Sequence, residues 1–250
     1  MLEHNAEVDT TDIRGWTPPF YAARRGREAI ELMLLDHNAN PRFTAFDQAG
    51  NRTALHYAVM NGHAGIAKVL IERGAVVDAQ DKIGRTPLMK VVSTELSESD
   101  VTTVMETLLY YGADINFSSD DEATALRLAS HHHKDAVELL ISQPEIKINS
   151  KEKTFGLTAL SFAAAVGVRD IVHVLLKAPG IEVNSQDNTG RTALSWAAGQ
   201  GHHMVVQLLL DHVDINASQE DDQGRTPAKL ATSGGHQRIV SQIVAHLRKS

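Results

Sequence analysis

A threonine recurs along this chain at nearly constant intervals, each time five residues before a small apolar residue. Neighbouring copies are 36, 33, 38, 34, 34 and 34 residues apart. The seven copies are Thr17, Thr53, Thr86, Thr124, Thr158, Thr192 and Thr226, and the small residues are Ala22, Ala58, Val91, Ala129, Ala163, Ala197 and Ala231. A period of this length is typical of a repeat array, in which each unit is stabilised by its neighbours rather than by one central core. We therefore expect seven units along the 250 residues.

Each unit carries the signals of two helices. A glycine two residues before the threonine, as at Gly84 and Gly190, permits the positive φ of a tight turn. The threonine hydroxyl can cap a first helix, and a proline at Pro87 or Pro227 suits its first turn. Another glycine nine residues after most of the threonines ends this helix, and an apolar stripe begins a second helix four residues later.

These units resemble the ankyrin repeat family, whose repeats have about 33 residues and a Thr-Pro-Leu-His-x-Ala signature. Residues 53–58 read Thr-Ala-Leu-His-Tyr-Ala, residues 62–63 read Gly-His, and residues 112–116 read Gly-Ala-Asp-Ile-Asn. The resemblance implies an all-α ankyrin-repeat solenoid of helix pairs with hairpin or turn fingers. Linkers such as residues 143–149 and 178–184 also resemble those of the ankyrin arrays in fungal NACHT-type receptor proteins, which suggests a larger host protein.

We interpret the chain as a single elongated domain over residues 1–250, made of about seven repeats and an N-terminal partial repeat. Residues 1–11 match the closing stretch of a repeat whose helices are missing, so the chain is expected to start within an array or with a half-repeat cap. The expected repeats are residues 12–46, 47–80, 81–117, 118–151, 152–186, 187–220 and 221–250.

Composition restricts the functions to consider. The net charge is −7, with 24 basic against 31 acidic residues, which argues against nucleic-acid binding as the main role. The absence of cysteine excludes disulfides, thiolate metal sites and cysteine nucleophiles. No apolar run approaches the roughly 18 residues that a membrane span needs. We therefore expect an intracellular protein, cytoplasmic or nuclear, without a membrane span.

Two units depart from the pattern. The third unit is five residues longer than the second before its closing glycine, and residues 93–100 in it are polar. We interpret the extra residues as a solvated loop before the second helix, capped by Ser99 or Asp100, with a partner contact or phosphorylation site as the alternative. In the fourth unit Glu122 and His133 occupy glycine positions, which predicts strain or a locally different turn.

No pattern in the sequence indicates catalysis, a cofactor or a metal site, since phosphate-loop, dinucleotide and hydrolase motifs are absent. Three consecutive histidines, His131, His132 and His133, would fan around a helix axis and could not converge on one ion, so a ligand contact or pH sensing is the better interpretation for His131 and His132. In the family, four of the other histidine positions form hydrogen bonds between turns. These four are His56, His63, His202 and His236.

The resemblance also implies where a partner would bind, because ankyrin repeats use finger tips and the exposed face of the first helices. These surfaces map to positions four, three and one before each threonine and seven and eight after it. The candidates are Arg14, Trp16, Arg24, Arg25, Arg52, Met60, Asn61, Lys82 and Arg85 in the first three repeats, and His131, His132, Phe155, Arg191 and Gln200 in the later ones.

The first repeat is the most distinctive, because Arg14, Arg24 and Arg25 accompany Trp16 at a position expected to be exposed, although the whole chain is acidic. Arginine binds carboxylate and phosphate with two hydrogen bonds, and tryptophan and arginine are enriched in binding hot spots. An acidic or phosphorylated peptide, or an anionic small molecule, would suit this surface. The second tryptophan, Trp196, is expected to lie in the core.

The main hypothesis is a non-catalytic, monomeric protein-protein interaction module that binds a partner along its groove and finger tips, as part of a larger scaffold or receptor. One alternative is a small-molecule binder or unusual enzyme with a pocket between repeats near His131 and His132. Another is an architectural spacer that sets the distance between other domains.

Overall fold

The computed structural model describes residues 7–45 and 50–249, which form fourteen helices and one two-stranded sheet. Contacts divide the chain into two compact units, Met1–Asp120 and Asp121–Ser250, hereafter unit 1 and unit 2. The division falls within the expected fourth repeat, so the single-domain interpretation stays a prediction. Residues 1–6 of the expected partial repeat and the boundary near residue 46 lie outside the described residues.

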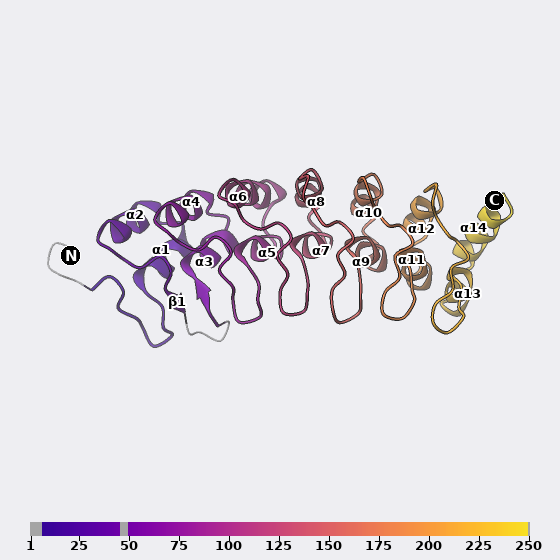
Figure 1. Cartoon of the computed structure of the whole chain (residues 1–250), viewed down its shortest axis with the longest axis horizontal. Coiled ribbons are helices and arrows are strands. Elements are labelled where there is room, and N and C mark those ends of the chain that lie inside the picture. Colours follow the sequence, from indigo (N-terminus) through magenta and orange to yellow (C-terminus); the bar gives the residue numbers. More distant parts are fainter. Residues whose placement is uncertain (1–6, 46–49, 250) are drawn as a thin grey trace. The chain divides into compact units, whose positions relative to one another are not determined.

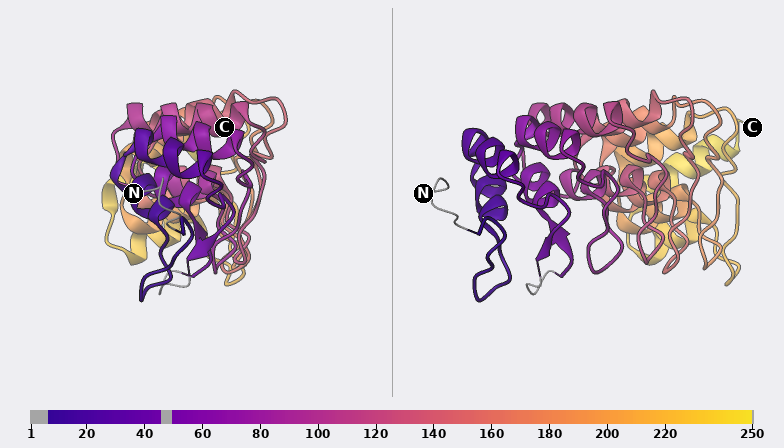
Figure 2. Two further views of the ribbon diagram at one scale, coloured as in Figure 1. Left: turned by 90° about the vertical axis from the view of Figure 1, so that its left-hand side faces the viewer. Right: turned by 60° about the vertical axis from the view of Figure 1, so that its left-hand side comes forward.

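Unit 1 is built from three helix pairs and a short hairpin (Figure 1). The elements are α1 (Pro18–Arg25), α2 (Glu28–Asp36), β1 (Thr44–Ala45), β2 (Arg52–Thr53), α3 (Ala54–Met60), α4 (Ala64–Glu72), α5 (Pro87–Val91) and α6 (Glu98–Tyr110). The first helices of the pairs, α1, α3 and α5, pack in one layer, and α2, α4 and α6 pack in a second (Figure 2). The strands are antiparallel, with Thr44 opposite Thr53.

Unit 2 repeats this arrangement with four helix pairs. They are α7 (Ala125–Ala129) and α8 (Lys134–Ile141), α9 (Ala159–Val166) and α10 (Arg169–Leu175), α11 (Ala193–Gln200) and α12 (His203–Leu210), and α13 (Pro227–Ser233) and α14 (Gln237–Leu247). Each first helix packs on the next first helix, and each second helix on the next second helix. The expected helix pairs are therefore present in both units.

The repeated threonines act as helix caps in six of the seven repeats. In Thr158 and Thr192 the hydroxyl accepts the amide of the third helical residue at 3.1 and 3.2 Å. Thr17 is the exception, because its buried hydroxyl has no partner among the described residues and the amide of Phe20 instead donates to the Thr17 main-chain carbonyl at 3.1 Å. The prediction of a threonine cap is therefore wrong for the first repeat alone.

Two finger turns place a non-glycine residue in the left-handed region that glycine occupies in the other repeats. Asn51 has φ 57° and Glu122 has φ 59°, as the glycine positions predicted. Asparagine tolerates this conformation, whereas glutamate adopts it rarely because its Cβ crowds the main chain. His133 does not take a positive φ; it is buried and stands at the start of α8, so α7 ends without a left-handed residue.

The third repeat corrects one expectation. Its extra residues do not all form a loop, because α6 begins at Glu98 and has 13 residues. Ser97 caps this helix by accepting the Asp100 amide at 3.2 Å, so the prediction of Ser99 or Asp100 as the cap is wrong. The acidic side chains of Glu98 and Asp100 suit the first turn, where the helix dipole favours negative charge.

Histidine side chains tie successive repeats together, as expected. In one such bond the Nε2 atom of His63 lies 3.3 Å from the Arg24 carbonyl, and in another that of His202 lies 3.1 Å from the Ala165 carbonyl. His56 joins its own helix to the next finger, with Nε2 3.1 Å from the Arg85 carbonyl. Burial lowers the pKa of His56 to about 4, so this link is neutral at physiological pH.

Candidate functional site

A cavity of about 370 Å³ in unit 1 brings together most of the candidate residues of the first two repeats. We call it the basic pocket, and its lining residues are Arg14, Trp16, Arg24, Arg52, Tyr57, Met60 and Asn61. Six of these seven were predicted from their repeat positions. The finger before α1 supplies Arg14 and Trp16, and the end of α1 supplies Arg24. The others come from β2, from α3 and from Asn61, which directly follows α3.

Trp16 is not exposed, contrary to the prediction, because only 6% of its surface is accessible. Its ring packs against those of Phe20, Tyr21 and Tyr57, with centroid distances of 6.3, 5.2 and 4.8 Å. The Arg24 guanidinium lies 5.3 Å from the Trp16 ring centroid, within the range of a cation–π contact. Trp16 therefore forms an aromatic floor that orients Arg24 rather than a projecting anchor.

The basic pocket is lined by three guanidinium groups and no carboxylate. Arg14 and Arg24 are exposed and Arg52 is half-buried. Within the described part of the chain, none of the three forms an ion pair, and the buried Nε of Arg52 has no hydrogen-bond partner. The exposed guanidinium groups of Arg14 and Arg24 are available to an anion, because the fork of arginine matches the oxygens of carboxylate and phosphate.

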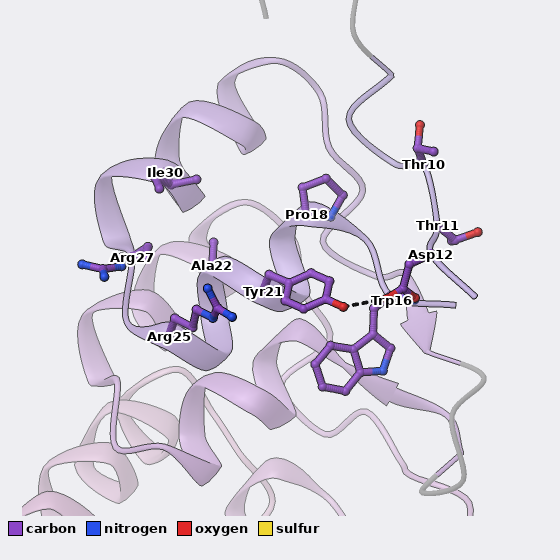
Figure 3. Close-up of a pocket in the computed structure, with 10 residues that line it drawn as sticks. All are labelled: Thr10, Thr11, Asp12, Trp16, Pro18, Tyr21, Ala22, Arg25, Arg27 and Ile30. Atoms are coloured by element: carbon purple, nitrogen blue, oxygen red, sulfur yellow. Dashed lines mark hydrogen bonds between the residues drawn. The ribbon is translucent and has the colours of Figure 1, made fainter. Parts of the chain in front are cut away.

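The other candidates of unit 1 lie outside the basic pocket. Arg25 follows Arg24 directly, yet it lines a different cavity, of about 650 Å³, together with Trp16 and Tyr21 (Figure 3). Lys82 is exposed in the finger of the third repeat. Arg85 is half-buried there, and its main chain is held by the carboxylate of Asp81 at 3.0 Å.

Unit 2 has a cavity of about 420 Å³ between its finger turns, which includes the candidates Phe155 and Arg191. The Arg191 guanidinium lies 4.9 Å from the ring centroid of Trp196, which is half-buried rather than in the core as predicted. Unlike the basic pocket, this cavity includes the carboxylates of Asp187 and Asp222. It therefore lacks the uniform charge of the site in unit 1.

A buried carboxylate beneath this cavity holds two arginines. Asp221 accepts Arg225 at 2.7 Å, and Arg191 lies 3.6 Å away. The hydrogen bond from Arg225 lowers the pKa of Asp221 to about 2. The charges of Arg191 and Arg225 are therefore partly neutralised within the protein, which weakens their attraction for an external anion.

The remaining candidates of unit 2 lie apart from this cavity. The Nδ1 atoms of His131 and His132 are 2.8 Å apart, and the His131 ring packs 6.1 Å from that of Phe162. Gln200 is exposed at the end of α11. In the described residues there is no group of three or more His, Asp or Glu side chains arranged to hold a metal ion, and no helix long and apolar enough to cross a bilayer.

One structural feature of the fingers was missed from the sequence. A carboxylate five residues before the threonine accepts the main chain of its own turn and also a side chain from the following helix. Asp12 accepts the Tyr21 hydroxyl at 2.6 Å, Asp81 pairs with the Lys90 ammonium at 3.0 Å, and Asp187 accepts the Trp196 indole at 2.7 Å. An aspartate recurs at this position in the sequence and could have indicated the feature. The hydrogen bond from the Trp196 indole to Asp187 explains why Trp196 is half-buried rather than in the core.

The family model for ankyrin repeats matches residues 1–81, 45–101, 76–152, 95–187 and 160–249. The chain therefore belongs to the ankyrin repeat family. This assignment confirms the resemblance to ankyrin repeats and the fold expected from the sequence, whereas the resemblance to the arrays of fungal NACHT-type receptor proteins stays a prediction. Ankyrin repeat domains are in general protein-protein interaction modules and are typically not enzymatic.

Relatives and solved structures agree with this assignment. The chain is 34% identical over 178 residues to the ankyrin repeat and KH domain-containing protein mask-1 of Caenorhabditis elegans, which covers 71% of this chain and 6% of that protein. It is 34% identical over 132 residues to the neurogenic locus notch homolog protein 1 of Xenopus laevis, covering 52% of this chain and 5% of that protein. The chain thus spans a small part of these relatives.

Two crystal structures of ankyrin repeat domains superpose on most of the chain. The domain of Bcl-3, described as a unique member of the IkappaB protein family, gives a TM-score of 0.77 at 24% identity, covering 92% of this chain and 99% of the other. The human ASB11 domain gives a TM-score of 0.75 at 26% identity, covering 90% and 97%.

Proposed function

We propose that the chain is an interaction module that binds an acidic or phosphorylated segment of a partner protein in the basic pocket. The observation that carries this proposal is the convergence of Arg14, Arg24 and Arg52 around the Trp16 floor without a carboxylate among the lining residues. A lone exposed arginine would attract an anion only weakly. Three guanidinium groups around one cavity would bind carboxylate or phosphate oxygens more strongly.

The aromatic floor adds a second contribution. Tyr57 and Met60 line the cavity beside Trp16, so an aliphatic or aromatic side chain next to the acidic group would bury apolar surface there. The ligand that fits best is therefore an extended peptide with an apolar residue adjacent to a phosphoserine, aspartate or glutamate. We further propose that binding takes place inside cells, in the cytoplasm or nucleus, because a chain without cysteine suits a reducing compartment.

The test uses fluorescein-labelled peptides of the form Gly-Ser-Leu-X-Gly-Ser, in which X is phosphoserine, glutamate, serine or lysine. Fluorescence polarisation should rank phosphoserine above glutamate, with serine and lysine much weaker. The affinity for phosphoserine should fall as salt rises, since exposed charges are screened. Equal affinity for the serine and phosphoserine peptides would exclude the proposal.

Two adjacent arginines provide a matched pair of variants, because Arg24 and Arg25 lie on the same helix but line different cavities. Arg24→Ala should weaken binding of the phosphoserine peptide about five- to tenfold, the usual size of one partly screened charge-assisted contact. Arg25→Ala should leave it within about twofold. Arg238→Ala, an exposed residue of unit 2, controls for net charge. Equal losses in all three variants would show nonspecific attraction instead.

A further inference from the structure

Two places in the chain carry an arginine directly before the threonine in two successive repeats. In both places the second of the two repeats also has a buried aspartate five residues before its threonine. The three charged residues are Arg52, Arg85 and Asp81 in unit 1, and Arg191, Arg225 and Asp221 in unit 2. Because the same charged residues stand at the same repeat positions, the two places can be compared directly.

The aspartate neutralises both arginines in unit 2 and neither of them in unit 1. Asp221 lies 2.7 Å from Arg225 and 3.6 Å from Arg191. Asp81 instead pairs with the Lys90 ammonium at 3.0 Å, and within the described residues neither arginine of unit 1 forms an ion pair. One carboxylate thus compensates two guanidinium groups in unit 2, whereas its equivalent in unit 1 is occupied by a third cation.

The residue four positions after the threonine accounts for this difference. It is Leu230 in the seventh repeat, which cannot donate to the aspartate, and Lys90 in the third. In the other repeats the residues at this position are uncharged, namely Tyr21, Tyr57, Leu128, Phe162 and Trp196. Lys90 is only 7% exposed, so its ammonium is held at Asp81 rather than in water. Burial lowers the pKa of Lys90, and the nearby charges of Arg52 and Arg85 lower it further, against the hydrogen bond to Asp81.

The two uncompensated arginines belong to neighbouring fingers of unit 1. The Lys82 amide of the third repeat donates to the Gly50 carbonyl of the second at 3.0 Å, and α3 packs on α5. Arg52 also lines the basic pocket, so Arg85 extends the positive surface of that pocket by one repeat. The surface ends at the following finger, where exposed Asp120 donates its amide to a carbonyl of the third finger at 3.2 Å and would repel a further anion.

We propose that Arg52 and Arg85 form a second anion subsite beside the basic pocket, and that the partner is a peptide with two acidic or phosphorylated residues about three positions apart. The proposal rests on the proposed function, because one of the two anionic groups occupies the basic pocket. Neighbouring helices pack about 8 to 10 Å apart, and an extended peptide advances about 3.3 Å per residue, which gives this spacing. Lys90 is a positioning residue that keeps Asp81 from neutralising the second subsite.

The test compares singly and doubly phosphorylated peptides by fluorescence polarisation. The reference has one phosphoserine after a leucine and is extended with alanine at both ends. A second phosphoserine three residues before or three residues after the first should raise the affinity about five- to tenfold in one of the two directions, because it gains charge-assisted hydrogen bonds. A second phosphoserine directly after the first should raise the affinity at most about twofold, since one pocket cannot hold both phosphates and the remaining attraction is screened.

Two variants weaken the second subsite by different routes. Arg85→Ala removes one of its guanidinium groups. Lys90→Met leaves Asp81 to bind Arg52 and Arg85, as the equivalent aspartate binds its arginines in unit 2. In both variants the gain from the second phosphate should fall below about twofold, while preference for phosphoserine over serine remains and verifies that the variant is folded. Lys68→Ala, an exposed residue of α4, should keep the full gain and controls for net charge.

The outcomes separate this proposal from the proposed function. If phosphoserine binds better than serine but neither three-residue spacing adds affinity, the second subsite alone is overturned. A full gain in Arg85→Ala, or in folded Lys90→Met, also overturns it. Equal binding of the serine and phosphoserine peptides by the unmutated chain overturns both proposals. Tighter binding of a short single-stranded oligonucleotide than of the doubly phosphorylated peptide would assign the surface to nucleic acid, which the net charge of −7 argues against.

Discussion

Replacement of Glu31 by glutamine should remove a pH-dependent loss of stability from unit 1. Glu31 is fully buried in α2, and neither of its carboxylate oxygens has a hydrogen-bond partner among the described residues. The equivalent residues of other repeats are Ala67, Val172 and Val206, all buried. Burial without a partner raises the pKa of Glu31 from 4.5 to about 8. The carboxyl group is therefore protonated in the folded protein at neutral pH.

The sign of the effect follows from the two pKa values. Below pH 4.5 the carboxyl group is protonated in both the folded and the unfolded chain, so it does not change stability with pH. Between pH 4.5 and about 8 the unfolded chain releases the proton whereas the folded chain retains it, so the free energy of unfolding falls as pH rises. At about 1.4 kcal/mol per pH unit, the loss from pH 5 to pH 8 approaches 4 kcal/mol as an upper bound.

The assay uses the two tryptophans, one in each unit. In a Trp196→Phe background, the fluorescence of the buried Trp16 reports urea unfolding of unit 1. The free energy of unfolding of Glu31→Gln minus that of its parent should rise by about 2 to 4 kcal/mol between pH 5 and pH 8. The exposed Glu28 lies in the first turn of the same helix, and Glu28→Gln should show no such rise. A difference for Glu31→Gln that stays constant with pH would refute the reasoning.

Three further predictions concern the repeat positions. Glu122→Gly should stabilise unit 2 by about 1 kcal/mol in urea unfolding, because Glu122 has φ 59°; destabilisation would show that its side chain has a compensating contact. Thr192→Val should lower the free energy of unfolding by about 1 kcal/mol in the same assay, because Thr192 caps its helix. Thr17→Val should be neutral or stabilising, because the Thr17 hydroxyl does not cap its helix. Equal losses in the two variants would contradict this difference. Burial lowers the pKa of His56 to about 4, so between pH 6.5 and pH 4 the unfolded chain binds a proton that the folded chain does not, and the free energy of unfolding falls as pH falls. His56→Gln should flatten this pH dependence of the free energy of unfolding. An unchanged slope would argue against a neutral buried histidine.

The helix pairs and their caps could be predicted because they depend on local chemistry repeated many times. A threonine before an apolar helix has the same role wherever the main chain has the same conformation, and histidines at fixed repeat positions bond to the neighbouring repeat. The prediction that Thr17 caps its helix fails for a local reason. Two consecutive prolines, Pro18 and Pro19, occupy the start of α1, and they are visible in the sequence. A proline-proline start removes two amide donors from the first turn and alters the pairing of the third.

Burial of the tryptophans could not be predicted in the same way, because it depends on which side chains meet across repeats. Trp16 stands one residue before the threonine, where most repeats place an arginine, and this position suggested exposure. Its ring is covered because Tyr21 lies on the helix that follows, α1, and Tyr57 comes from the next repeat. The repeat register identifies the position of a residue, but the size of its neighbours decides whether that position is accessible.

The two tryptophans nevertheless show why a charged pocket forms in unit 1 and not at the fingers of unit 2. In both places an arginine lies over a tryptophan ring, Arg24 over Trp16 and Arg191 over Trp196. Below Arg191 the buried Asp221 is within 3.6 Å, whereas the residues that line the basic pocket include no carboxylate. The same stacking contact therefore holds a compensated charge at Arg191 in unit 2 and an uncompensated charge at Arg24 in unit 1. Only an uncompensated charge gains a strong contact when an anion displaces the water around it.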